Sequence, residues 1–562
     1  MTATQPVLDA SDDHTISTNP VSKPSRRRRI AAGVGTTLAV LLIWLALVLP
    51  NDVAQVSLGA LVRIPLEGIL LVALLLVLPR RAKGPAAIVI GVLLALLLIV
   101  KVFDMGFLVA FGRLSNPAFD WVYAGSAIDL LSLSIGRTQA TLAVVAALLL
   151  IGALLVAMPW AVLRLARLTE RHRVGTIRAA GALGVVWIAF ALLGLMLPSA
   201  APVASSSAAR LTYEHVGQVS AGIRDQATFA EEAAVDPFRQ VPADQLLTAL
   251  RGKDVIVAFV ESYGRVAVEG SDFSSGVTAV LDEGTTKLRD AGFSSRSAFL
   301  TSPTFGGLSW LAHSTLQSGL WIDSQQRYDQ LVDTDRLTLS GAFKRAGWRT
   351  VADVPSNEQD WSQGTAFYDY DTIYDARNVG YRGPTFSYAS MPDQYVLSAF
   401  HRNELAQPGH APVMAEIDLV SSHTPWTPLP RAVDWSAVGD GSVFRGMQFL
   451  GPSPDLLWRN ADNVRTSYGA SIQYTLSTLV SFVQEYGDDN LVLIVLGDHQ
   501  PATIVSGPGA SHDVPITIIS KDAGVMDRVA SWGWTAGMRP DSATPVERMD
   551  SFRNRFLSTF VQ

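Results

Sequence analysis

Long apolar runs fill the first third of the chain, and shorter ones follow. Each long run has roughly the 20 residues that an α-helix needs to cross a bilayer. The runs lie at residues 30–49, 57–79, 85–103, 139–163 and 179–198. This pattern predicts an α-helical membrane domain with five transmembrane helices at residues 26–198. Residues 1–25 are rich in Ser, Thr, Asp and Pro and lack apolar periodicity, which predicts a disordered cytoplasmic tail.

Basic residues cluster at alternate ends of these runs. Arginines 26–29 precede the first run, a second group lies at 80–83, and a third lies at 164–178. Lys and Arg are enriched on the cytoplasmic flanks of membrane helices, so five crossings would leave everything after Pro198 outside the membrane. A twin-arginine export signal is the alternative for the first group, but the run that follows is long for a cleaved signal.

A few ionisable residues interrupt the apolar runs. Arg63 and Glu67 are spaced to share one helix face, as are Lys101 and Asp104. Mutual pairing or snorkelling near the outer interface is the favoured interpretation of all four. A site for a lipid headgroup is the alternative, because charged side chains at membrane depth often mark function.

The second part of the chain changes character. Residues 199–245 are predicted to form a linker and a juxtamembrane helix. Residues 246–562 alternate short apolar runs with amphipathic stretches, which predicts an extracytoplasmic α/β domain with a mostly parallel central sheet. The predicted strands are Asp254–Val260, Arg349–Ala352, Val413–Leu419, Leu491–Gly497 and Val514–Ile519. The predicted helices are Leu337–Trp348, Ser467–Gly487 and Val546–Phe560.

Composition narrows the possible functions. Hydrophobic residues make up 49% of the chain, and the net charge of −6 gives no basic field for a nucleic acid. The chain has no cysteine, which excludes disulfides, thiolate metal sites and cysteine nucleophiles. Any metal must therefore be held by His, carboxylate or hydroxyl groups.

Three of the predicted strands end in side chains that can do chemistry. Glu261 follows the first, His423 lies just after another, and Asp498 with His499 follows a third. The carboxyl ends of neighbouring parallel strands meet at one edge of a sheet, where ligands bind. An Asp–His pair offers one hard oxygen and one imidazole nitrogen, which suits zinc or manganese. Each residue alone could equally belong to an ordinary polar turn.

Hydroxyl groups gather in a glycine-rich turn at residues 301–309, just before a predicted helix. The N-terminus of a helix favours anions, and a hydroxyl held there on a metal becomes a better nucleophile. An ordinary capped helix start is the alternative, since Ser and Thr are common caps.

Five motifs together resemble the alkaline phosphatase/sulfatase superfamily, and the whole chain resembles its membrane-anchored lipoteichoic acid synthase-like phosphoglycerol transferases. The motifs are Val-Ile-Val-Ala-Phe-Val-Glu-Ser-Tyr-Gly at 255–264, Ser-Trp-Leu-Ala-His-Ser-Thr-Leu-Gln-Ser-Gly at 309–319, Met-Pro-Asp-Gln-Tyr at 391–395, Ser-Ser-His-Thr-Pro at 421–425 and Leu-Gly-Asp-His-Gln-Pro at 496–501. The resemblance implies one divalent metal, most often manganese, with zinc or magnesium possible. The metal ligands that it implies are Glu261, Ser309, Asp498 and His499.

The resemblance also implies catalytic and substrate-binding residues. Ser309 matches the nucleophile, although the family's transferases commonly use threonine, which leaves Thr304 as an alternative. His423 matches a histidine that contacts the substrate. His512 resembles a more weakly matched histidine that supports the site, and His313 and Trp310 are further substrate-binding candidates.

The implied activity is transfer of a phospho-headgroup, phosphoglycerol or similar, from a membrane lipid to a cell-envelope glycan through a covalent serine intermediate. A phosphodiesterase, phosphatase or sulfatase-like hydrolase is the alternative, and a non-catalytic envelope sensor is a third hypothesis. Sulfatases need Pro and Arg shortly after the modified residue, and Ser309-Trp-Leu-Ala-His313 has neither. An unmodified serine suits phosphoryl transfer better than sulfate ester hydrolysis. The sequence leaves the oligomeric state open.

Overall fold

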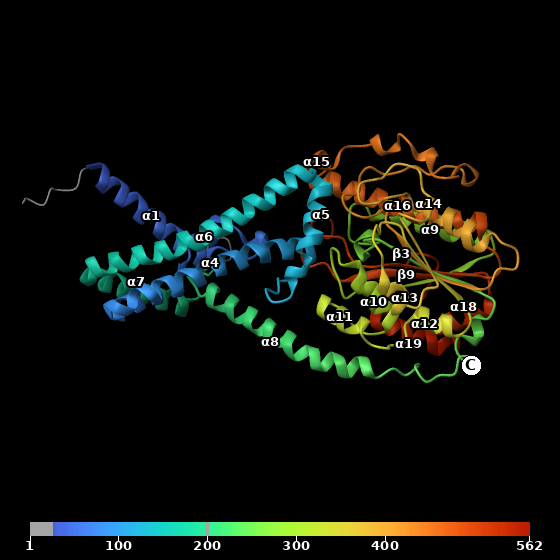
Figure 1. The fold of residues 1–562 in the computed structure, drawn as a ribbon, viewed down its shortest axis with the longest axis horizontal. Coiled ribbons are helices and arrows are strands. Elements are labelled where there is room, and N and C mark those ends of the chain that lie inside the picture. Colours follow the sequence, from blue (N-terminus) through green and yellow to red (C-terminus); the bar gives the residue numbers. More distant parts are fainter. Residues whose placement is uncertain (1–25, 197–201, 562) are drawn as a thin grey trace, which may run out of the picture. The chain divides into compact units, whose positions relative to one another are not determined.

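The computed structural model describes residues 26–196 and 202–561, so the tail predicted at 1–25 lies outside the described residues. Internal contacts divide the chain into two compact units (Figure 1). The first comprises Met1–Val48, Leu61–Leu96 and Ala153–Ser206. The second comprises Leu49–Ala60, Leu97–Gly152 and Ser207–Gln562. The second unit therefore includes parts of the apolar helices as well as the α/β region.

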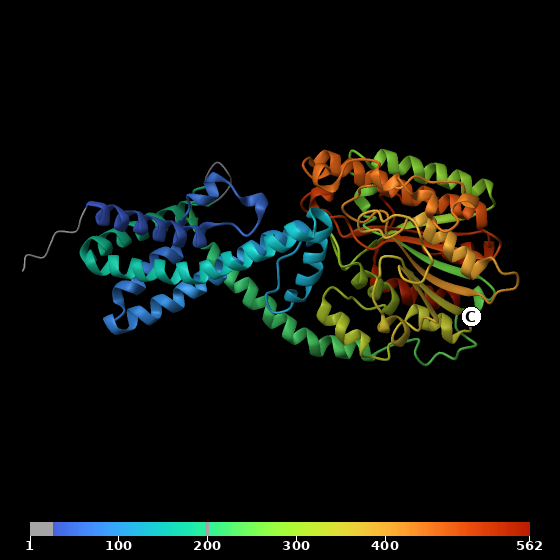
Figure 2. The ribbon, with the colours of Figure 1, turned by 45° about the horizontal axis from the view of Figure 1, so that its top comes forward.

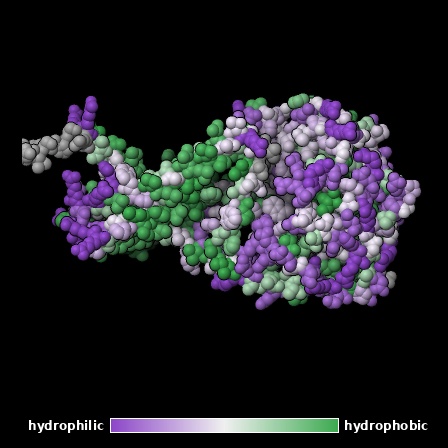
Figure 3. All heavy atoms as spheres, in the orientation of Figure 1, coloured by the Kyte–Doolittle hydropathy of each residue, from purple (hydrophilic) through white to green (hydrophobic). Residues whose placement is uncertain are grey.

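Within residues 26–196 and 202–561, four helices are long and apolar enough to cross a membrane. They are α1 (Arg26–Val48), α4 (Arg80–Phe111), α6 (Arg137–Arg171) and α7 (Arg173–Leu193). In Figure 3, hydrophobic residues cover the surface of these helices, whereas hydrophilic residues predominate on the α/β region. The expected region of long apolar helices is thus confirmed for four of them, by length and composition.

The prediction of five spanning helices is not confirmed, because the second apolar run is broken. It forms α2 (Leu58–Leu61), the short strand β1 (Ile64–Pro65) and the 12-residue helix α3 (Leu66–Val77). Proline lacks a backbone N–H, and Ile64–Pro65 instead pairs with β2 (Ala204–Ser205). A helix of this length spans about 18 Å, short of the ~30 Å hydrocarbon core.

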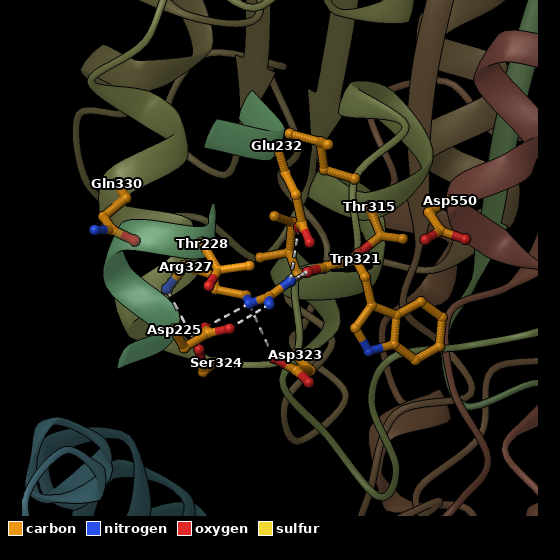
Figure 4. Close-up of polar contacts among 12 residues, drawn as sticks. Asp225, Thr228, Glu232, Thr315, Trp321, Asp323, Ser324, Arg327, Gln330 and Asp550 are labelled. Carbon is orange, nitrogen blue, oxygen red and sulfur yellow. Dashed lines mark hydrogen bonds and ion pairs between the residues drawn. The ribbon is translucent and has the colours of Figure 1, made fainter. Parts of the chain in front are cut away.

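The helix α8 (Ser207–Ala234) lies within residues 199–245, where a helix was predicted, and packs on α11 (Gln325–Val332). Arg327 anchors it, because its guanidinium donates to both oxygens of Asp225 at 2.5 and 2.7 Å (Figure 4). Glu232, about two turns further along α8, lies 3.6 Å from the same guanidinium. A cavity of about 400 Å³ adjoins this contact, but its arginines, Arg327 and Arg548, are already paired with carboxylates.

A nine-stranded sheet forms the centre of the α/β region, in the order β10-β4-β9-β8-β3-β7-β5-β6, with β11 beside β4. Its strands are β3 (Asp254–Val260), β4 (Ser294–Thr301), β5 (Arg349–Val354), β6 (Thr372–Asp375), β7 (Val413–Leu419), β8 (Leu491–Gly497), β9 (Asp513–Ser520), β10 (Thr535–Ala536) and β11 (Val546–Arg548).

The sheet is mixed, which corrects the prediction of a mostly parallel one. The block β8-β3-β7-β5-β6 is parallel throughout. The strand β9 runs antiparallel to both β8 and β4, and β10 runs antiparallel to β4. A second correction concerns Val546–Phe560, which was predicted as one helix. Its first three residues extend the sheet as β11, and α19 (Met549–Phe560) follows.

Helices cover both faces of the sheet (Figure 2). One face packs against α9 (Ser274–Asp290), α14 (Asp393–Phe400) and α16 (Ala461–Tyr486), and the other against α10 (Ser309–Ser318), α12 (Leu339–Arg345), α18 (Ala523–Ala530) and α19. Alternate residues of β3 and β8 point into the two cores, so every residue of both strands is buried. Because both faces of these strands are buried, their sequences are unbroken apolar runs. Further short helices are α13 (Ser362–Ala366) and α17 (Thr503–Ser506).

Candidate metal and nucleophile site

The carboxyl ends of β8, β3 and β7 meet at one edge of the sheet, as the sequence predicts. Val260 at the end of β3 pairs with Gly497 on one side and Leu419 on the other. Glu261 and the pair Asp498 and His499 therefore leave neighbouring strands side by side, and all three are buried. We call these three residues the Asp498 cluster.

Glycine is required where β8 ends, because β3 continues close beside it. A Cβ atom on Gly497 would lie 1.9 Å from the Tyr263 carbonyl oxygen. This close approach lets one oxygen of Asp498, Oδ1, accept hydrogen bonds from the backbone N–H groups of Ser262 (2.8 Å) and His499 (2.7 Å). Two backbone donors fix the orientation of the carboxylate. Its other oxygen, Oδ2, is buried and has no hydrogen-bond partner.

The ring of His499 is oriented by its own backbone neighbour. Its Nδ1 lies 2.8 Å from the Gln500 carbonyl oxygen, so this nitrogen carries the proton and donates it. The other nitrogen, Nε2, then faces oxygens, with Glu261 Oε1 at 3.3 Å and Asp498 Oδ2 at 3.4 Å. A backbone carbonyl that holds one imidazole nitrogen in this way is typical of metal-ligating histidines.

Ser309 is the first residue of α10, and its hydroxyl reaches the Asp498 cluster. The Oγ atom donates to Glu261 Oε2 at 2.9 Å and lies 3.3 Å from His499 Nε2. The preceding turn is anchored to the same strand end, because Gly306 N–H donates to the Gln500 carbonyl at 2.8 Å. A backbone hydrogen bond therefore ties the segment that carries Ser309 to the segment that carries Asp498 and His499.

The end of α4 packs against this turn, within the second unit. A Cβ atom on Gly306 would lie 1.7 Å from the Ala110 carbonyl oxygen, so the turn can approach α4 this closely only with glycine. Nearby, the Thr503 hydroxyl donates to the Val109 carbonyl at 2.8 Å. Phe305 lies beside Gly112, the first residue after α4. The turn that carries Ser309 is thus shaped in part by a helix of the membrane region.

The charges of the Asp498 cluster favour a divalent cation. Burial and the nearby Glu261 raise the pKa of Asp498 to about 7. Despite burial, Asp498 and Glu261 raise the pKa of His499 to about 9, while His423 and His499 hold the pKa of Glu261 well below its ordinary value. Where two carboxylates crowd together, one of them binds a proton more readily unless a cation offsets their charge. The ligand atoms lie within 4.8 Å of one another, and the unpartnered Asp498 oxygen fits the same interpretation.

Thr304, the alternative nucleophile, is placed differently from Ser309. It is buried, and its Oγ1 lies 3.4 Å from the Ser302 hydroxyl. Ser302 in turn donates to the Asp498 carbonyl oxygen at 2.5 Å. Thr304 therefore belongs to the hydrogen-bonded support beneath the turn, and the role of Ser309 as the nucleophile stays a prediction.

His423 lies in the loop after β7, on the other side of Glu261. The loop is tied to the cluster, because the neighbouring Ser422 hydroxyl donates to the Glu261 carbonyl at 2.6 Å. The Nδ1 of His423 lies 2.5 Å from the Thr424 carbonyl oxygen, and its ring stacks on Tyr388 at 3.5 Å. Burial lowers the pKa of His423, which favours the neutral imidazole with Nε2 as a proton acceptor.

A second group of ionisable residues was not found from the sequence. His313, one turn after Ser309 on α10, places Nδ1 3.1 Å from Glu416 Oε1 and 3.5 Å from Asp418 Oδ1. We call these three residues the Glu416 cluster. Despite burial, Asp418 and Glu416 raise the pKa of His313 to about 9. Two carboxylates at alternate positions of an apolar strand share one face, and this signal could have revealed them.

The remaining substrate-binding candidates lie at the edge of the site. Trp310 donates its indole N–H to Gln325 at 3.0 Å, and its ring lies near that of Tyr123. The backbone carbonyl of His512 accepts from Ser302 N–H at 2.9 Å, and its ring contacts Phe305. Both residues thus support the turn that carries Ser309. Roles in substrate binding stay predictions for both.

A scan against protein-family models and a search of curated proteins give no match. A search of solved structures does find similar chains. The lipoteichoic acid synthase LtaP from Listeria monocytogenes is 14% identical with a TM-score of 0.35, and the match covers 49% of this chain and 66% of that one. The Streptococcus pyogenes phosphoglycerol transferase GacH, in complex with sn-glycerol-1-phosphate, is 13% identical with a TM-score of 0.32, covering 53% and 74%.

The soluble domain of lipooligosaccharide phosphoethanolamine transferase A from Neisseria meningitidis is also similar, at 14% identity and a TM-score of 0.36, with 57% and 93% covered. This chain thus spans just under two thirds of the LtaP chain that it matches. At these identities and TM-scores the matches carry no argument about this chain, and its function is argued from its own residues.

Proposed function

We propose that this protein is a membrane-anchored, metal-dependent enzyme that transfers a phospho-headgroup, phosphoglycerol or similar, from a lipid to a cell-envelope glycan. The observation that carries the proposal is the position of the Ser309 hydroxyl. It lies at a helix N-terminus, donates a hydrogen bond to Glu261 Oε2 at 2.9 Å and lies 3.3 Å from His499 Nε2. A nucleophile, a cation site and a site that favours anions therefore coincide.

Glu261, Asp498, His499 and the Ser309 hydroxyl would hold the metal. A divalent ion supplies a Lewis acid there, which lowers the pKa of the serine hydroxyl and offsets charge on the phosphoryl oxygens. The mixed oxygen and nitrogen donors suit manganese, our first choice, and also zinc or magnesium. The cation would replace the protons that the crowded carboxylates otherwise bind, so its binding should be favoured at higher pH.

The side chains around Ser309 divide the proton transfers between them. Glu261 accepts a hydrogen bond from Oγ and orients it, and the Oγ proton passes to solvent as Oγ forms a bond to phosphorus. The bond from phosphorus to the lipid oxygen breaks, and that oxygen takes a proton from His313, which Glu416 and Asp418 keep protonated. The neutral His423 then accepts the proton of the incoming glycan hydroxyl, whose oxygen bonds to phosphorus as the bond to Ser309 Oγ breaks. Oγ takes a proton back from solvent, and His313 and His423 return to their starting states by proton exchange with water.

The membrane region supports an extracytoplasmic position for this chemistry. The basic groups at 26–29, 80–83 and 164–178 fall on one side only if the chain also crosses between α1 and α4. We assign that crossing to residues 58–77, with the short α3 completed by the broken segment before it. This arrangement gives five crossings and puts the site beside the outer leaflet, where a lipid donor presents its phosphodiester.

Mass spectrometry of Ser309 tests the proposal. Right-side-out membrane vesicles that contain the protein and manganese are incubated with a donor phospholipid isotopically labelled in its headgroup. We expect a labelled phosphodiester on the peptide that contains Ser309, and none in Ser309→Ala or in inside-out vesicles. Turnover by Ser309→Ala should fall by up to about 10⁶-fold, as for other catalytic nucleophiles. Retained turnover with a label on Thr304 would move the nucleophile to that residue.

The same reaction distinguishes transfer from hydrolysis. Addition of an envelope glycan should discharge the labelled Ser309 and move the label to the glycan. Release of the free labelled headgroup at an equal rate without glycan would instead identify a phosphodiesterase or phosphatase. A protein that carries no label and retains no divalent metal when purified without chelators would refute both enzymatic functions.

A further inference from the structure

Exposed apolar side chains on the α/β region concentrate in one short segment. Residues 246–561 contain seven exposed large hydrophobic side chains, and five of them lie between 443 and 458. Phe449 is the extreme case, with 81% of its surface exposed, followed by Leu456 at 51% and Trp458 at 41%. Single exposed apolar residues are ordinary on a protein surface, but a contiguous group marks an interaction site. We call Phe449, Leu450, Leu456 and Trp458 the apolar rim.

The rim is built on an ordered backbone. The short helix α15 (Pro454–Leu457) begins with proline, whose fixed φ suits the first helical position. Leu450 N–H donates to the Met447 carbonyl at 2.9 Å, and the Thr427 hydroxyl donates to the Pro452 carbonyl at 2.7 Å. These bonds hold Phe449 and Leu456 outward on a folded surface, so their exposure is a property of the native structure.

The rim is joined to the catalytic side of the molecule. Trp458 stacks on the buried ring of Trp426 at 5.7 Å, with only 8° between the planes. Trp426 lies three residues after His423, and its indole N–H donates to the Ser422 carbonyl at 2.8 Å. Ser422 in turn bonds to the backbone of Glu261. A force or displacement at the rim therefore acts on the loop that carries His423.

The rim also adjoins the water-side end of a spanning helix, within the second unit. The helix α15 contacts α5 (Ala124–Ile135), as seen in Figure 1. Only Gly136 separates α5 from the first residue of α6, the 35-residue apolar helix. Trp121, just before α5, is 73% exposed, and Ile128 on α5 is also exposed. Aromatic side chains at the end of a membrane span are typical of the bilayer interface.

We propose that the apolar rim inserts into the outer boundary of the bilayer and holds the His423 loop at the level of the lipid phosphodiester. This inference rests on the proposed function for the identity of the lipid as substrate. The occupant of the rim is the bilayer, because the rim continues the apolar surface of α5 and α6. The exposed side chain of Arg445 flanks it, and a cation beside an apolar surface favours anionic headgroups, whereas the neighbouring Arg459 is paired with Asp455.

The absence of cysteine makes the position of the rim directly measurable. The full-length Phe449→Cys variant is labelled with an environment-sensitive fluorophore and reconstituted into vesicles of phosphatidylglycerol and phosphatidylcholine. Replacing part of the lipid with a doxyl-labelled lipid should quench the label. Val546→Cys is the matched control, because Val546 is an exposed residue of the same domain, outside the rim. Equal quenching at the two positions would overturn the proposal, as would a label shielded by a second protein copy and insensitive to doxyl lipid.

A kinetic comparison tests the consequence for the substrate. Substituting Phe449→Ser together with Leu456→Ser should raise KM for the vesicle lipid about tenfold. Turnover of a short-chain, water-soluble phosphodiester should not change. An equal effect on both substrates would show that the rim acts on the fold of the site and not on membrane docking. Failure of the wild-type protein to turn over either substrate would refute the proposed function, whereas the quenching result would still decide the position of the rim.

Discussion

The Asp498 cluster and the Glu416 cluster are built from the same residue types, yet different donors surround them. Each combines two carboxylates with one histidine, and each has ligand atoms close enough for a metal ion. Each also has one buried carboxylate oxygen without a hydrogen-bond partner, Asp498 Oδ2 and Asp418 Oδ1. In the Glu416 cluster, Glu416 Oε2 accepts hydrogen bonds from the Tyr370 hydroxyl at 2.8 Å and from Gln317, whereas in the Asp498 cluster Glu261 Oε2 accepts one from the Ser309 hydroxyl.

This difference favours the Asp498 cluster as the cation site. In the Glu416 cluster, two neutral donors already stabilise the charge on Glu416. The Asp498 cluster directs the His499 Nε2 and several oxygens toward one another, with the Ser309 hydroxyl as the nearby donor. A group of acidic side chains therefore identifies a metal site only when its hydrogen-bond donors have been counted.

The largest effect is expected from a substitution in the Asp498 cluster, because only this cluster is expected to bind the metal. Substituting Asp498→Asn should lower kcat by about 10³-fold or more, because a bound metal contributes several kcal/mol to the transition state. Manganese should stabilise the wild-type protein by about 2.7 kcal/mol at a hundred times its Kd, and this gain should vanish in the variant. Thermal unfolding with and without manganese measures the gain.

Glu416→Gln is the matched control, since it removes one carboxylate charge from the other cluster. The variant should keep the stabilisation by manganese. If manganese stabilised Asp498→Asn normally and failed to stabilise Glu416→Gln, the roles of the two clusters would have to be exchanged.

An intermediate effect is expected when the protonated side chain of His313 is removed. Substituting His313→Gln should lower kcat by about 10² to 10⁴-fold, the usual contribution of a general acid. The pKa of His313 is raised to about 9, so the folded protein loses this proton as the pH rises through 9, and wild-type activity should fall there. The variant should lack this alkaline decline and keep its metal stabilisation. A pH–rate profile measures both.

His410→Gln is the control, because it removes a histidine that lies away from the site. His410 lies 3.7 Å from Asp254, at the opposite end of β3 from the site. Its substitution should leave the alkaline decline in place. A decline that persisted in His313→Gln would assign the titration to a different group.

The smallest effect concerns the donors that satisfy the Glu416 cluster. Tyr370→Phe removes a hydrogen bond to a buried carboxylate and should destabilise the protein by about 1.5–3 kcal/mol. Tyr368→Phe removes a hydrogen bond between two neutral hydroxyls, Tyr368 and Ser314, and should cost about 0.5–1.5 kcal/mol. Chemical denaturation followed by tryptophan fluorescence compares the two. A larger loss of stability in Tyr368→Phe than in Tyr370→Phe would contradict this ranking of the two hydrogen bonds.

The local pattern of apolar residues was sufficient to predict the strands that carry the site. β3, β7 and β8 have the predicted bounds, because branched apolar runs buried on both faces end abruptly at polar residues. β4 was not predicted, since its first four residues are Ser294, Ser295, Arg296 and Ser297. Their place in a sheet depends on pairing with β9, more than 200 residues away along the chain. The interruption of the second apolar run was not predicted, although Arg63 and Pro65 mark its position in the sequence.

Site residues could be predicted where they directly follow a strand end. They could not be predicted where their role depends on residues far away in the sequence. Glu261, Asp498 and His499 were found because each directly follows an apolar strand. The partner of His313 lies 103 residues away, so no local pattern connects the two. The proton-holding role of His313 emerges only from the fold. The stacking of His423 on Tyr388 is likewise a tertiary contact.

The contact between Gly306 and the Ala110 carbonyl bears on what happens if the protein is cut. A protease acting between α8 and the membrane helices would shed a soluble α/β fragment without α4. The turn before Ser309 would then lose the surface that shapes it. Such a fragment should keep its cores and its metal ligands but work poorly, even on a soluble substrate. Shedding would thus switch the enzyme off at the moment it leaves its substrate-bearing surface.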